Sequence, residues 1–236
     1  MFENIDRFRH EHKYIEPDSN LYGIASRLDR LMKKDPHVTG KGYYSVRSLY
    51  FDDITNRYLN ENIDGVDERQ KWRIRVYDQN SDYICLERKI RKGDLVTKQS
   101  CVIDEHTLND ILAKKTDVSD NNPSLLNVFV VEMRTQALAP VVIVEYDRIP
   151  YVSAAGNTRI TIDKNISSSP EFDALLADRR LKARPLMESR NHLIEVKYDA
   201  YLPDHIAHTI EHGRMRRETF SKYYLARKFP YKWRLI

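Results

Sequence analysis

The sequence predicts an α+β fold, because its candidate strands occur in groups with helices between them and not in a regular strand–helix alternation. A second observation is that many of these strands carry charged residues on one face and apolar residues on the other. The third is length: 236 residues fit one β-rich domain, which we expect to span residues 1–236.

Eight segments are predicted to form strands, because turn residues separate them and apolar and polar residues alternate along them. They cover residues 7–15, 43–51, 71–77, 83–90, 95–103, 141–151, 158–163 and 192–198. The segment 91–94, which contains Gly93 and Asp94, has the composition of a hairpin turn. Helices are predicted at residues 18–34, 105–115, 124–137 and 203–227.

Charged residues recur at every second position of most predicted strands. Lys71, Arg73 and Arg75 share one face of their strand, whereas Trp72 and Ile74 lie on the other. The same alternation groups Arg9, Glu11 and Lys13, then Glu87 and Lys89, Lys98 and Ser100, Tyr146 and Arg148, Arg159, Thr161 and Asp163, and finally Glu195 and Lys197.

Two architectures account for these charged faces, and periodicity alone does not choose between them. In a half-exposed sheet the charged faces meet water. In a closed barrel they point inward and line a mostly cationic tunnel, while amphipathic helices cover the apolar outside. Like charges in an empty tunnel repel one another, so removal of Arg73 or Arg75 is then expected to leave the empty protein no less stable.

Composition and charge exclude several other classes. The net charge of +4 is too small to indicate a nucleic-acid partner. Cys85 and Cys101 do not have the spacing of a structural zinc site, and they suit a reducing compartment. The sequence shows neither a signal peptide nor an apolar run of the roughly 20 residues that a membrane span needs. We therefore expect a cytoplasmic protein.

Several motifs, in this order and spacing, resemble those of the VTC (vacuolar transporter chaperone) catalytic domain, a branch of the triphosphate tunnel or CYTH-like enzymes. The resemblance runs from Phe8 to about Lys228. The motifs are Arg9-His10-Glu11-His12-Lys13-Tyr14, Ser45-Val46-Arg47-Ser48-Leu49-Tyr50-Phe51-Asp52, Lys71-Trp72-Arg73-Ile74-Arg75-Val76-Tyr77, Leu86-Glu87-Arg88-Lys89, Glu145-Tyr146-Asp147-Arg148, Arg159-Ile160-Thr161-Ile162-Asp163, Ile194-Glu195-Val196-Lys197 and Phe220-Ser221-Lys222-Tyr223.

The resemblance implies a closed antiparallel β-barrel tunnel of about eight strands, covered by helices, and a role for each matching residue. It implies catalytic roles for Lys13, Arg73, Arg75, Lys89, Arg148 and Arg159. It implies phosphate binding by Arg47, Lys71, Lys98, Lys197, Ser221 and Lys222, and nucleotide binding by Tyr146. A divalent metal, Mn²⁺ or Mg²⁺, would be held by Glu195 and more weakly by Glu11. Arg47 fits least well, because Leu49 and Phe51 share its face.

One residue departs from the pattern of the hydrolytic tunnel enzymes. Those enzymes carry Glu-x-Glu-x-Lys on the first strand, whereas this chain has Arg9, Glu11 and Lys13. Loss of a carboxylate is expected to weaken metal and water activation there. The departure therefore favours a polymerase over a hydrolase, although Glu11 is retained.

The resemblance implies a metal-dependent polyphosphate polymerase, which transfers the γ-phosphoryl group of ATP to a growing polyphosphate chain and releases ADP. Two alternatives stay open. One is a tripolyphosphatase or nucleoside triphosphatase of the same tunnel fold, and the other is a non-catalytic polyphosphate sensor. ATP and inorganic polyphosphate or triphosphate are the expected partners, a membrane-protein partner stays possible, and the oligomeric state is left open.

Overall fold

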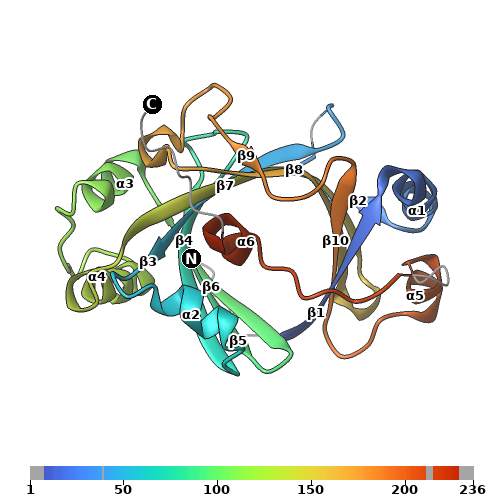
Figure 1. Cartoon of the computed structure of the whole chain (residues 1–236), viewed down its shortest axis with the longest axis horizontal. Coiled ribbons are helices and arrows are strands. Elements are labelled where there is room, and N and C mark those ends of the chain that lie inside the picture. The colour runs from blue at the N-terminus through green and yellow to red at the C-terminus, as the bar shows by residue number, and fades with distance from the viewer. Residues whose placement is uncertain (1–7, 39, 211–214, 229–236) are drawn as a thin grey trace.

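Strands dominate the computed structural model, which describes residues 8–38, 40–210 and 215–228 (Figure 1). The strands are β1 Arg9–Pro17, β2 Lys33–Lys34, β3 Tyr44–Asp52, β4 Glu68–Tyr77, β5 Ile84–Lys92, β6 Leu95–Ile103, β7 Ala139–Ser153, β8 Thr158–Ser169, β9 Arg184–Pro185 and β10 Asn191–Tyr198. The α-helices are α1 Asp18–Leu31, α2 Arg57–Ile63, α3 Glu105–Leu112, α4 Ser124–Thr135, α5 Asp204–Ile210 and α6 Lys222–Lys228.

Eight of the strands form a closed ring. Their order is β7-β3-β4-β5-β6-β1-β10-β8, and antiparallel pairing of β8 with β7 completes the circuit. The two-residue strands β2 and β9 attach to β7 and β8. The closed alternative is therefore confirmed, and the α+β class with it.

The ring is weakly paired between β1 and β6. Only Arg9 and His10 of β1 pair with β6, whereas eight residues of β1 pair with β10. Farther along β1, the backbone N–H of Glu218 donates to the Lys13 carbonyl at 2.9 Å. The segment that leads into α6 therefore lies along β1 where β6 has diverged from it.

The apolar core lies outside the ring, in two clusters. The first cluster packs α1 and α5 on β1, β8 and β10, and includes Leu28 and Ile206. The second packs α3 and α4 on β3, β4 and β5, and includes Phe129 and Trp72. Figure 1 shows these helix pairs on opposite sides of the ring and α6 over its centre. Charged side chains are thereby left to face inward.

The predicted helix at 203–227 is wrong. Helix α5 ends at Ile210, the described residues 215–221 are not helical, and α6 begins at Lys222. Pairing of Glu218 with β1 replaces the helical hydrogen bond that its N–H group would otherwise make. Residues 211–214 of the predicted helix, and Arg7 of the first predicted strand, lie outside the described residues.

Helix α2 is absent from the sequence-based prediction. Its start is held by two aspartates, because Asp52 accepts from the N–H of Tyr58 and Asp53 accepts from the N–H of Arg57. Asn56, just before the helix, has a left-handed φ of 57°.

In the described part of the chain, no helix has both the length and the apolar character needed to cross a bilayer.

Candidate active site

A cavity of about 480 Å³ lies inside the ring of strands. Among the described residues, twelve lysines and arginines but only three glutamates line it. The predicted site residues that line it are Glu11, Lys13, Lys71, Arg73, Arg75, Lys89, Lys98, Tyr146, Arg148, Glu195, Lys197, Ser221 and Lys222. The period of two brings together those on strands, since each occupies an inward face, whereas Ser221 precedes α6 and Lys222 is its first residue.

Arg47 does not line the cavity, which corrects its assignment to the phosphate-binding group. Its guanidinium is buried and donates to the carbonyls of Ala177 and Arg179, both at 2.6 Å, and to Glu145 at 3.1 Å. Arg47 shares the outward face of β3 with Leu49, so it fastens the segment after β8 to the outside of the ring.

Arg159 is also absent from the cavity lining, although it is in register with Lys197, which does line it. Its Nη2 lies 3.0 Å from Tyr44 Oη and 3.0 Å from Asp35 Oδ2. Asp35 is buried and accepts a hydrogen bond from the N–H of His37. Arg159 is therefore on the inward face but tied to the end of the ring.

Glu87 gathers three cations on one side of the cavity. Its side chain is 1% exposed and contacts Arg73 Nε at 2.6 Å, the Lys98 ammonium, and Arg75 at 3.8 Å. Burial alone would raise the pKa of Glu87, but these cations hold it well below its usual range. Arg73 and Arg75 therefore have a buried counter-ion as well as a place on the cavity wall.

Glu11, on β1, lies among three lysines. Its carboxylate lies 2.9 Å from Lys89, 3.2 Å from Lys197 and 3.9 Å from Lys13. Burial opposes ionisation, yet the lysines hold the pKa of Glu11 well below normal. Burial in turn lowers the pKa of Lys89 to about 7. Part of the Lys89 population is therefore neutral near pH 7, and an anion that binds beside it would favour the charged form.

Helix α6 inserts its first residue, Lys222, between two buried carboxylates. Lys222 Nζ lies 2.7 Å from Asp163 Oδ2 and 2.7 Å from Glu195 Oε1. Arg148 donates two hydrogen bonds, of 2.7 and 2.8 Å, to the carboxylate of Asp163. The ring of Tyr146 lies under both cations, with Lys222 Nζ 4.8 Å and Arg148 Cζ 5.1 Å from its centroid. This cluster fixes α6 over the ring.

Lys71 differs from these cations because the groups its ammonium contacts are neutral. Its Nζ donates to Asn62 Oδ1 at 2.7 Å and Ser221 Oγ at 3.2 Å, and lies 5.0 Å from the ring centroid of Tyr223. Burial, followed by the charges of Lys89 and Lys13, holds the pKa of Lys71 well below its usual value. A bound anion would supply the negative counter-charge that the neutral contacts of this ammonium do not provide.

We expect anion binding to drive proton uptake at Lys71. A polyphosphate favours the ammonium, so the pKa of Lys71 rises on binding, and affinity falls as pH rises through the range between the two pKa values. Calorimetry of tripolyphosphate binding at a series of pH values, each in two buffers of different ionisation enthalpy, measures this uptake. Lys71→Met should reduce it, and an unchanged proton count in that variant would contradict the assignment.

Several cavity residues were not predicted from the sequence, among them Asn62, Arg69 and Arg91. Arg69 continues the alternation of Lys71 and Arg73, but the predicted strand began at residue 71, three residues after the start of β4. Arg91 was assigned to the turn, whereas β5 runs to Lys92. Asn62 could not be found because its helix, α2, was missed.

The carboxylates of the cavity fit only a metal that is bound chiefly by other ligands. Among the described residues, no three His, Cys, Asp or Glu side chains are grouped so as to hold a metal. Glu195 and Glu11 line the cavity, but each is in contact with lysines. Mg²⁺ is often held by one or two carboxylates together with substrate phosphates and water, and this donor set fits that mode.

Asp35 is expected to hold Arg159 away from the cavity. Asp35→Asn keeps a side chain that can accept from His37 but removes the charge that binds Arg159. The released guanidinium should strengthen tripolyphosphate binding by about 1 kcal/mol, roughly fivefold. Calorimetric binding to both Asp35→Asn and Asp35→Asn/Arg159→Ala checks this, because a gain that persists without Arg159 would have another cause.

Comparisons with known proteins agree with this geometry. The model of the VTC domain family matches residues 8–231, whereas a comparison with curated proteins gave no match. A proposed adenylate cyclase from Vibrio parahaemolyticus has a TM-score of 0.55 at 9% identity, over 94% of this chain and 98% of that one. A proposed adenylyl cyclase from Hippeastrum, described as revealing a dominant triphosphatase activity, has a TM-score of 0.54 at 14% identity, over 93% and 95% of the two chains. The chain therefore belongs to the VTC domain family, and its ring of strands has the triphosphate tunnel fold.

Proposed function

We propose that this protein is a polyphosphate polymerase that transfers the γ-phosphoryl group of ATP to the end of an inorganic polyphosphate chain. One observation carries the proposal. The described cavity wall holds twelve lysines and arginines against three glutamates, inside a closed ring of strands. A linear polyanion neutralises such a wall, because guanidinium forks and ammonium groups match phosphate oxygens.

The state of the cavity carboxylates favours transfer to phosphate over transfer to water. Nearby cations hold the pKa of Glu11 and Glu195 well below normal, against the effect of burial, so both are weak bases. Hydrolysis benefits from a base that takes a proton from water. The terminal phosphate of a polyphosphate chain is already ionised and needs no such base. Arg9, which lines the cavity in place of a carboxylate, adds to this preference.

In the proposed reaction, an oxygen of the terminal chain phosphate attacks the γ-phosphorus of ATP. The bond from that phosphorus to the β–γ bridging oxygen breaks, and its electron pair leaves on ADP. Arg73, Arg75 and Arg148 would align the phosphates and stabilise the charge that develops on the transferring oxygens. Lys13 and Lys89 would do the same from the wall around Glu11. Neutralisation and alignment would thus supply most of the catalysis.

The remaining predicted residues would bind substrate in supporting roles. Lys98, Lys197 and Ser221 would hold phosphates next to the reacting ones, and Tyr146 would face the nucleotide. Arg159 would join them only when it separates from Asp35. Bound at Glu195, with Glu11 nearby, a divalent ion such as Mn²⁺ or Mg²⁺ would neutralise phosphate charge.

Incubation with ATP and Mn²⁺, followed by gel analysis of the products, tests the proposal. The expected product is a ladder of long polyphosphate chains with ADP. A hydrolase of the same fold would instead release orthophosphate. A sensor would release neither product while still binding polyphosphate, and either of these results would overturn the polymerase assignment.

A further inference from the structure

Like charges face each other on β4 and β5 where these strands leave the cavity. Arg69 is directly opposite Arg91 in the antiparallel register, and two residues farther in Lys71 is opposite Lys89. All four line the cavity. Opposed side chains have Cβ atoms roughly 5 Å apart, and like charges at such positions destabilise a sheet. In the inner pair, Glu11 lies 2.9 Å from Lys89 and offsets part of this repulsion, so the outer pair is the one that a bound anion would relieve most.

The hydrogen bonds and the ion pair of the outer pair involve backbone carbonyls and one exposed carboxylate. Arg69 Nη1 donates to the Val66 carbonyl at 2.7 Å, and Arg91 Nε donates to the Gly93 carbonyl at 2.6 Å. Arg91 also lies 3.5 Å from Asp94, whose side chain is 97% exposed. Burial and the charge of Arg91 lower the pKa of Arg69, and the nearby carboxylates of Asp67 and Glu61 offset this only in part. This contrasts with Arg73, deeper on the same strand, whose partner Glu87 is buried.

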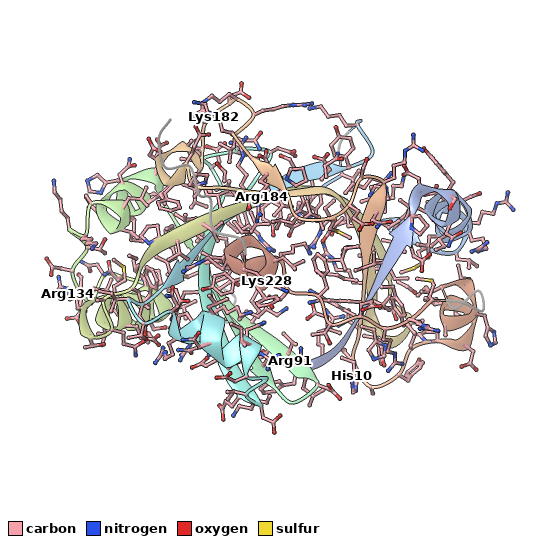
Figure 2. The ribbon with its side chains drawn as sticks, viewed as in Figure 1. His10, Arg91, Arg134, Lys182, Arg184 and Lys228 are labelled. Carbon is pink, nitrogen blue, oxygen red and sulfur yellow. The ribbon has the colours of Figure 1, made fainter. Side chains whose placement is uncertain are left out.

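The two ends of the ring differ in their cations. At the end where β3 begins, Arg159 is held by Tyr44 and Asp35 and does not line the cavity. At the end where β5 and β6 join, Arg69 and Arg91 do line it. Figure 2 shows Arg91 at the edge of the ring beside this hairpin. Cations without buried counter-ions therefore continue outward at this end.

We propose that Arg69 and Arg91 form an outer subsite for inorganic polyphosphate, which binds chain phosphates beyond those at the cavity centre and leads the chain out at the β5–β6 end. The inference rests on the proposed function. From Arg73 to Arg69 the strand rises about 13 Å, at roughly 3.3 Å per residue. A triphosphate bound at Arg73 and Arg75 is too short to reach the outer pair, whereas a longer chain bound there reaches it.

The test compares ligands of two lengths on one double variant. Arg69→Ala/Arg91→Ala should weaken binding of long-chain polyphosphate on the order of tenfold or more. It should also flatten the salt dependence of that binding, since two half-buried cations no longer contribute. Binding of tripolyphosphate should change by less than about threefold, because that ligand does not reach the pair. Arg30→Ala/Arg180→Ala removes the same charge from exposed positions away from the cavity and serves as the control.

The outcomes separate this inference from the proposed function. Equal weakening of both ligands, or of neither, would overturn the outer subsite while leaving the polymerase proposal intact. Failure of the unaltered protein to bind either ligand would overturn the proposed function and the subsite together. If the alanine variant does not fold, Arg69→Gln/Arg91→Gln removes the same charges, keeps most of each side chain, and must show the same length dependence.

Discussion

Replacement of Lys222 by methionine is expected to lower the free energy of unfolding by about 3–5 kcal/mol at neutral pH. The side chains of Asp163 and Glu195 are 0% and 8% exposed, and both would lose the ammonium that lies 2.7 Å away. Arg148 would still bind Asp163, but Glu195 would keep only the longer contacts with Arg148 at 3.6 Å and Lys197 at 3.7 Å.

The loss of stability caused by Lys222→Met should be smaller at acidic pH. Burial would raise the pKa of Glu195, but Lys222 and other cations hold it well below normal. Without Lys222 that pKa rises, so the destabilisation is largest above the ordinary carboxyl range and fades as pH falls and the carboxyls take up protons. Urea unfolding at pH 7 and pH 4 measures it, with the exposed Lys182→Met as control. A loss that is the same at both pH values would contradict the buried-charge explanation.

Lys71→Met is expected to weaken tripolyphosphate binding by roughly 1.5–3 kcal/mol, about ten- to a hundredfold, without loss of stability. The folded state lowers the pKa of Lys71, so its ammonium opposes folding at every pH below its unfolded pKa. Methionine fills similar space without that charge. The empty variant should therefore unfold at the same temperature as the unaltered protein or above it.

Arg73→Ala is the matched comparison and should lower both tripolyphosphate binding and stability. It is expected to lose a similar share of binding and also about 1–3 kcal/mol of stability, because the buried carboxylate of Glu87 loses its donor at 2.6 Å. This replaces the sequence-based expectation that Arg73 can be removed without loss of stability. Thermal melting and calorimetry on both variants decide the point. If Lys71→Met melts well below Arg73→Ala, then Lys71 is part of the scaffold.

The faces of the strands were predictable from the sequence, because side chains alternate with a period of two whatever the strand pairs with. Lys13, Arg73, Lys89 and Arg148 were placed on inward faces for that reason, and all four line the cavity. Closure of the ring depends on pairing between β7 and β8, which alternation does not report. It was expected only from the family resemblance.

The sequence does not report the tertiary contacts on which the roles of Arg47 and Arg159 depend. Arg47 carries the same charge as the tunnel cations, but it lies on an apolar face and binds carbonyl groups outside the ring. Arg159 lies on the correct face, but Asp35, more than a hundred residues earlier in the chain, holds it at one end. The counter-ions of Arg73 and Lys222 were likewise invisible, since strand periodicity does not show which carboxylates meet which cations.

Extension of a polyphosphate primer of defined length by ATP labelled in its γ-phosphate tests whether this protein transfers phosphoryl groups to polyphosphate. The label is expected in a chain one phosphate longer, with one ADP released for each phosphate added. The extension should be lost in Arg73→Ala and kept in the exposed-charge control Arg30→Ala/Arg180→Ala. Label found only in orthophosphate, with the primer unchanged in length, would contradict the polymerase assignment.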